Sequence, residues 1–149
     1  MNTLLLQFFM IIALFALIAA KQVSFNTIFT IKQISSKELR GNAMFALRES
    51  LSSTLNIPLK TILNGKVTEE DKQSLKVAFP IELEASSYPL LHNDAVNIFF
   101  ELSHELKKVV DSGSFTETLK NALISYNALQ SSAMEISEVH FAEFSIAKD

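Results

Sequence analysis

The chain contains no cysteine and no tryptophan, and it has only three glycines and three prolines among its 149 residues. The lack of cysteine excludes disulfide frameworks, thiolate zinc sites, iron–sulfur clusters and cysteine nucleophiles. The scarcity of glycine and proline disfavours an all-β sandwich or barrel, because such folds need many turns. The composition therefore favours long helices, and the length fits one domain.

Neither sign of charge dominates, since 13 basic and 16 acidic residues give a formal net charge of −3. This balance gives no support for nucleic-acid binding, and the basic residues form no patch with interleaved aromatic residues. The mean hydropathy of +0.24 is nevertheless high. Most of that excess lies in the first twenty residues, so an apolar leader precedes a body of ordinary polarity.

The apolar leader covers residues 4–20, with Gln7 as its only polar interruption. At about 1.5 Å per residue, a helix of this length spans about 25 Å, the short end of a membrane-spanning helix. We therefore predict a transmembrane anchor over residues 1–24. A cleaved secretory signal is the alternative, but no basic residue precedes the leader, and bulky Leu17 or Ile18 would occupy the −3 position of the cleavage site.

Basic residues near the leader all follow it, and none precedes it: Lys21, Lys32, Lys37 and Arg40. Positive charge resists translocation, so the rule for membrane orientation places the N-terminus outside and the C-terminal domain in the cytoplasm. The sequence thus predicts a single-pass protein of the cell membrane that contacts membrane lipid through residues 4–20.

The body shows four amphipathic segments with apolar side chains at helical spacing. The first covers Asn42–Leu55, the second follows a possible capping box at Thr68, the third runs from Val96 to Val110, and the fourth extends from Ser114 to Ile136. Isolated helices shorter than about 12–15 residues are marginal in water, so these segments need to pack together. We expect an all-α fold, in which an N-terminal transmembrane helix is followed by an antiparallel helical bundle of about four helices.

The predicted bundle domain covers residues 25–149, and the sequence indicates how its last two helices begin and end. Gly113 is expected to end the third helix in a left-handed conformation. The adjacent Phe99 and Phe100 are interpreted as core residues. The tail over residues 139–146 alternates only loosely and is compatible with a helical turn, a short strand or a packed coil.

The sequence contains no recognisable catalytic motif. The phosphate-loop pattern fails because Lys60 stands where its first glycine belongs, and His104 begins only half of a zinc-protease motif because Lys108 replaces the second histidine. His92, His104 and His140 are too scattered to indicate a metal site. We predict no catalytic residue, cofactor, metal or small-molecule substrate. A small enzyme would require a cleft lined by His104 and two carboxylates.

Several motifs in the chain resemble the LemA family of bacterial membrane proteins. The motifs are Tyr88-Pro89-x-Leu91, Phe99-x-x-Leu102-x-x-x-Leu106, Tyr126-Asn127, and Phe25-Asn26-x-Ile28-Phe29 after the apolar leader. The family also has a run of basic residues that this chain lacks, since Ser52, Ser53 and Thr54 stand in its place. The resemblance implies an outward N-terminus, one membrane span and a cytoplasmic antiparallel bundle. It supplies no catalytic residue, because the family has no agreed enzyme activity.

The predicted function is non-enzymatic protein–protein interaction at the cytoplasmic membrane, with a protein partner that the sequence does not identify. Tyr88 and Pro89 are the structural or interaction candidates in the connection before the third helix, and Tyr126 and Asn127 are those of the last helix. The alternative is an exported, signal-cleaved helical protein that binds an apolar ligand or partner in its core.

Overall fold

The computed structural model describes residues 3–8, 10, 21–84, 95–128 and 132–148. Residues 3–8 are helical. The body contains, in order, β1 (Lys21–Lys32), α2 (Asn42–Leu55), the 3₁₀ helix η1 (Leu59–Thr61), β2 (Lys66–Glu69), β3 (Ser74–Glu84), α3 (Ala95–Asp111), α4 (Ser114–Ser125) and β4 (Glu135–Lys148). The predicted all-α fold and helical bundle are therefore wrong, because four strands form one sheet in the described residues.

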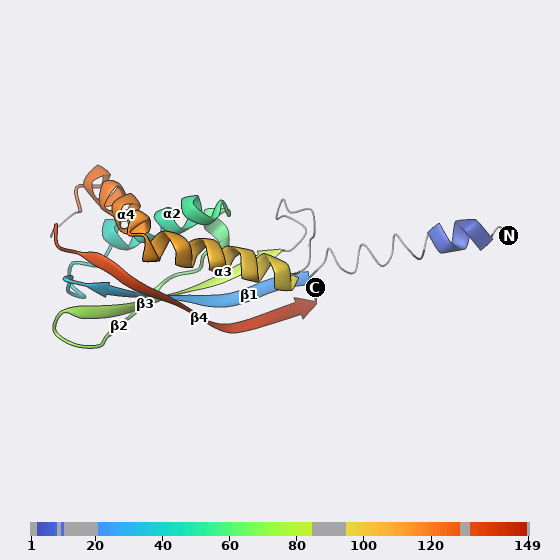
Figure 1. Cartoon of the computed structure of the whole chain (residues 1–149), viewed down its shortest axis with the longest axis horizontal. Coiled ribbons are helices and arrows are strands. Elements are labelled where there is room, and N and C mark those ends of the chain that lie inside the picture. Colours follow the sequence, from blue (N-terminus) through green and yellow to red (C-terminus); the bar gives the residue numbers. More distant parts are fainter. Residues whose placement is uncertain (1–2, 9, 11–20, 85–94, 129–131, 149) are drawn as a thin grey trace.

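The sheet has the strand order β2-β3-β1-β4, and every neighbouring pair is antiparallel. It follows that β1 and β2 run parallel with β3 between them, and that β3 and β4 run parallel with β1 between them. Helix α2 lies in the first connection, and α3 and α4 lie in the second. The result is two interleaved split β-α-β units, the ferredoxin-like topology. Figure 1 shows the helices gathered over one face of the sheet.

Strand β1 forms because its apolar residues occupy alternate positions. Val23, Phe25, Thr27, Phe29 and Ile31 are buried toward the helices, while Ser24, Asn26 and Ile28 are half-buried on the open face. A period of two residues is the pattern of a strand with one covered face. Residues 21–24, which the predicted anchor included, are therefore part of a strand and not of a helix, since residues two apart in a helix lie on nearly opposite sides.

The segment after Gly65 is a β-hairpin and not the expected helix. Thr68 belongs to β2, and the turn that follows is stabilised by Asp71, whose carboxylate accepts a hydrogen bond from the Gln73 backbone N–H at 2.7 Å. This bond holds the pKa of Asp71 below its ordinary value. The inward side chains of β3 then alternate in the manner of a strand: Leu75, Val77, Phe79, Ile81 and Leu83.

Strand β4 contains two β-bulges, which interrupt the alternation of apolar and polar residues in its sequence. Thr30 faces Glu138 and Ile31 faces Ile136, so Ser137 is one extra residue on β4. A β-bulge of this kind shifts the alternation of all residues beyond it by one position.

The second bulge lies near the end of β4. Ser24 faces Ser145 and Asn26 faces Ala142, so two residues of β4 oppose Phe25. One of these two, Glu143, has a positive φ of 56°. As a result the residues of β4 on the helix side follow steps of three, two, three and two: Ile136, Val139, Phe141, Phe144 and Ile146. The helix expected to reach Ile136 ends at Ser125, and the strand is the observed form of the tail.

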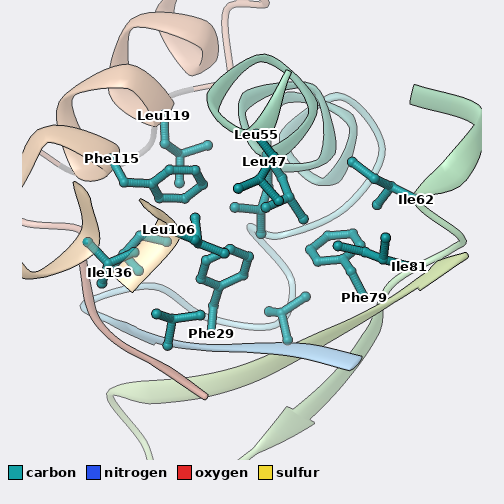
Figure 2. Close-up of a cluster of buried hydrophobic side chains, with 14 of the residues drawn as sticks. Phe29, Leu47, Leu55, Ile62, Phe79, Ile81, Leu106, Phe115, Leu119 and Ile136 are labelled. Carbon is teal, nitrogen blue, oxygen red and sulfur yellow. The ribbon is translucent and has the colours of Figure 1, made fainter. Parts of the chain in front are cut away.

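The helices cover a single apolar core, part of which is drawn in Figure 2. Phe29 of β1 lies at its centre, where its ring stacks on Phe115 of α4 at 5.1 Å and meets the edge of Phe79 of β3 at 6.3 Å. The predicted bounds of α2 are confirmed, and α3 lies where the third segment was expected. Gly113 has the expected left-handed conformation, with a φ of 82°.

No helix in the part of the chain that the structure describes is long and apolar enough to cross a membrane. This finding contradicts the predicted single-pass anchor, together with the cell-membrane location and orientation that depended on it. Residues 11–20 of the predicted span lie outside the described residues. The alternative of an exported helical binding protein is also wrong, because the body is a mixed α/β fold.

We predict that Thr27→Val stabilises the protein. Thr27 lies in the core with no exposed surface, and its hydroxyl has no hydrogen-bond partner. Burying an unsatisfied hydroxyl is unfavourable, so replacing it with a methyl group of similar size should raise the free energy of unfolding by about 1 kcal/mol. Urea denaturation measures the change. The control is Thr68→Val on exposed β2, which we expect to stay within about 0.5 kcal/mol of wild type. A destabilised Thr27→Val variant would contradict the prediction.

Candidate functional site

Two of the four predicted interaction residues lie at the end of α4, and the other two, Tyr88 and Pro89, lie outside the described residues. Tyr126 ends α4 and joins it to α2. Its hydroxyl donates a hydrogen bond to the Glu49 carboxylate at 2.5 Å, and its ring meets the edge of Phe45 with centroids 5.6 Å apart. Tyr126 thus fixes the packing of two helices.

Asn127 follows directly and terminates α4. Its φ of 54° is left-handed, which asparagine tolerates better than most residues. Its backbone N–H donates to the Ile124 carbonyl at 2.9 Å, and the Ala128 N–H donates to the Leu123 carbonyl at 2.7 Å. This is the usual hydrogen bonding of a helix C-terminus with a left-handed cap. Asn127 therefore has a structural role at this position.

The two histidines in the described part of the chain lie on different elements. His104 is exposed on α3, whereas His140 is exposed on the open face of β4, 3.1 Å from the Glu138 carboxylate. His92 lies outside the described residues. Among the residues that can be described, no group of three or more histidine, aspartate and glutamate side chains could hold a metal ion.

A shallow groove of about 650 Å³ crosses the end of the sheet, where β3, β1 and β4 lie side by side. Its acidic groups are Glu82 of β3 and Glu143 of β4, and the Glu143 carboxylate accepts a hydrogen bond from the Asn26 amide at 2.6 Å. The remaining polar side chains of its lining are Ser24 and Ser145. The groove is wide open to solvent and offers no nucleophile with an adjacent base.

A more distinctive feature lies beside this groove, where the first turns of α3 meet the end of β4. Phe99, Phe100, Phe144 and Ile146 form here an apolar surface that we call the aromatic end surface. Phe100 is 62% exposed, Ile146 41% and Phe144 38%. Scattered apolar residues are common on protein surfaces, but a cluster of exposed apolar residues such as this is a candidate interaction surface.

The pattern of α3 explains why Phe100 faces outward. Its core-facing residues recur at steps of three or four: Ala95, Ile98, Leu102, Leu106 and Val110. Phe100 lies two residues from both Ile98 and Leu102, which places it on the opposite side of the helix. The interpretation of Phe100 as a core residue is therefore wrong.

Phe99 connects the aromatic end surface to the core. Its half-buried ring lies 4.5 Å from the ring of Phe144, 5.2 Å from Phe25 and 6.2 Å from Phe141, measured between centroids. Edge-to-face and offset aromatic contacts at these distances are favourable. The exposed rings of Phe100 and Phe144 thus pack on Phe99, which in turn packs on the buried Phe25.

Comparison with known proteins gives no match to a family model, to a curated protein or to a solved structure. The resemblance to the LemA family stays a prediction, although the helical bundle that it implied is wrong.

We predict that Tyr126 loses its proton at a higher pH than an ordinary tyrosine. The hydrogen bond to Glu49 raises its pKa above the ordinary value of 10.0, and burial and the negative charge of Glu49 act in the same direction. Tyr88→Phe leaves Tyr126 as the only tyrosine, so the absorbance of tyrosinate reports its pKa directly. Adding Glu49→Gln should return the pKa toward 10.0.

The raised pKa also predicts how stability depends on pH. The folded chain binds this proton more tightly than the unfolded chain, so its contribution is complete below pH 10.0 and is lost as the pH rises through the pKa of the folded state. Tyr126→Phe should therefore remove part of the alkaline loss of stability. Equal pKa values with and without Glu49→Gln would contradict the assignment of the cause.

Proposed function

We propose that this chain is a non-catalytic protein-binding domain that takes up an apolar segment of a partner protein on the aromatic end surface. The observation that carries the proposal is the exposure of Phe100 and Phe144, whose rings both lie against the half-buried Phe99, together with the exposed Ile146 two residues further along β4. Phenylalanine is enriched in the cores of protein interfaces, and charged residues are depleted there.

The energetics favour an apolar partner. Burying a phenylalanine or isoleucine side chain that was fully exposed contributes about 1.5–3 kcal/mol. Three partly exposed side chains contribute less than the full amount each, so they supply the apolar centre of the interface, and further contacts with the partner must offset the entropy cost of association. The packing of Phe144 on Phe99, and of Phe99 on Phe25, restricts the rotamers of these rings before binding and therefore lowers the ordering cost.

The surroundings of the surface add polar specificity. Glu101 on α3 and Glu143 on β4 are exposed next to its aromatic residues. An interface with an apolar centre and a polar rim has this arrangement. We expect the partner segment to be apolar where it meets Phe100 and Phe144, and to carry basic or hydrogen-bonding groups at its margins.

Photo-crosslinking in the cells that make the full chain tests this function. Replacing Phe100 with the photoreactive residue p-benzoylphenylalanine should give a discrete covalent adduct, and mass spectrometry should place the crosslink in an apolar segment of the partner. Adding Phe144→Ser should reduce the adduct several-fold, since about 1 kcal/mol of apolar burial is lost.

The matched control carries the photoreactive residue at Lys107, which lies on the same helix with a side chain 65% exposed. An adduct that appears equally at both positions, or at neither, would refute the proposal. Circular dichroism and urea denaturation of each variant confirm that the fold is retained.

A further inference from the structure

The helical residues before the sheet expose a second apolar surface in the same chain. Leu5 and Leu6 are each 50% exposed, Phe8 is 60% exposed and Met10 is 66% exposed. We call these four side chains the leader surface. Such residues gain free energy from burial just as those of the aromatic end surface do.

The two apolar surfaces belong to the same end of the domain. β1 begins at Lys21, and Val23, two residues into the strand, pairs with Ile146 of the aromatic end surface. The chain therefore enters the sheet beside that surface, as Figure 1 shows by the position of the β1 start near the end of β4 and the beginning of α3.

The length of the connection permits the two surfaces to meet. Ten residues, numbered 11–20, separate Met10 from Lys21. A stretch of ten residues reaches at most about 35 Å when fully extended, whereas the step from Lys21 to Val23 along β1 is only about 7 Å. The leader surface can therefore reach Phe100 and Ile146 of its own chain.

Both surfaces are exposed in the structure, and we infer that the leader surface can fold back, dock on the aromatic end surface of the same chain and compete there with a partner. The inference rests on the proposed function only in treating this surface as a docking site. An intramolecular occupant has the advantage of high effective concentration, which for a short tether is in the millimolar range. The leader thus acts as an autoinhibitory segment that competes with the partner's apolar segment.

Disulfide trapping in the full chain tests the docking, and the natural absence of cysteine makes each introduced pair unique. Leu5→Cys with Phe100→Cys should form a disulfide within one chain. The matched control is Leu5→Cys with Ser145→Cys, because Ser145 is exposed and adjoins Phe144 and Ile146 but pairs with Ser24 on the open face. We expect the first pair to form at least about tenfold faster than the control pair.

A labelling experiment gives an independent measure. The thiol introduced by Phe100→Cys should react with a maleimide several-fold faster after Leu5→Ser and Leu6→Ser, because those changes weaken leader docking. The thiol introduced by Ser145→Cys should react at the same rate in both chains. Unchanged labelling of the Phe100→Cys thiol would overturn the inference.

The remaining outcomes assign the surface to other occupants and would also overturn the inference. Covalently linked dimers in place of linked monomers would indicate a second copy of the chain. A lipid surface would be the occupant if the wild-type chain sediments with phosphatidylcholine vesicles and both disulfide pairs form equally slowly.

The outcomes for the inference and for the proposed function are distinguishable. Rapid disulfide formation without a photo-crosslinked partner would support leader docking and refute the proposed function. A photo-crosslinked partner whose adduct is unaffected by Leu5→Ser and Leu6→Ser would support the function and refute autoinhibition. If both hold, those leader substitutions should increase the partner adduct several-fold.

Discussion

The pairing of β1 on both of its edges is the constraint on which the rest of the structure depends. It pairs with β3 from Gln22 to Lys32 and with β4 from Lys21 to Lys32, so both split β-α-β units share this strand. Its inward residues supply Phe25 to the aromatic cluster and Phe29 to the middle of the core. A register shift of one residue in β1 would turn these rings to the open face, so the apolar alternation fixes the register of the whole sheet.

The sequence correctly predicted the elements whose apolar residues recur with one uninterrupted period. Helix α2 was found with the right bounds because its apolar residues recur at steps of three and four, and Gly113 was recognised because a helix end requires a left-handed residue there. The alternation of β1 from Val23 to Ile31 was visible in the sequence. It was missed because the apolar leader runs directly into it, and residues up to 24 were assigned to a membrane anchor.

Strand β4 and the candidate site were harder to predict for a different physical reason. The bulges at Ser137 and Glu143 each add a residue, so the inward positions of β4 recur at steps of three and two that fit neither a simple strand nor a helix. Phe99 and Phe100 are neighbours in the sequence and both are apolar. The helical spacing of Ile98 and Leu102 already places Phe100 opposite the core, so its exposure could have been predicted. The contact of Phe99 with Phe144 depends instead on the position of α3 relative to β4, which is a property of the tertiary structure.

The bulge at Glu143 explains why the aromatic end surface exists. A left-handed backbone costs a residue other than glycine about 1–2 kcal/mol. Without the extra residue, the strict alternation of β4 beyond Ala142 would place Phe144 and Ile146 on the open face of the sheet and Ser145 toward α3. With it, both apolar residues turn toward α3, where Phe144 meets Phe99 and Ser145 lies on the open face opposite Ser24. The bulge therefore turns two apolar residues toward α3 although Phe144 stays 38% exposed and Ile146 41% exposed there, and this incomplete burial agrees with the proposed binding role of the surface.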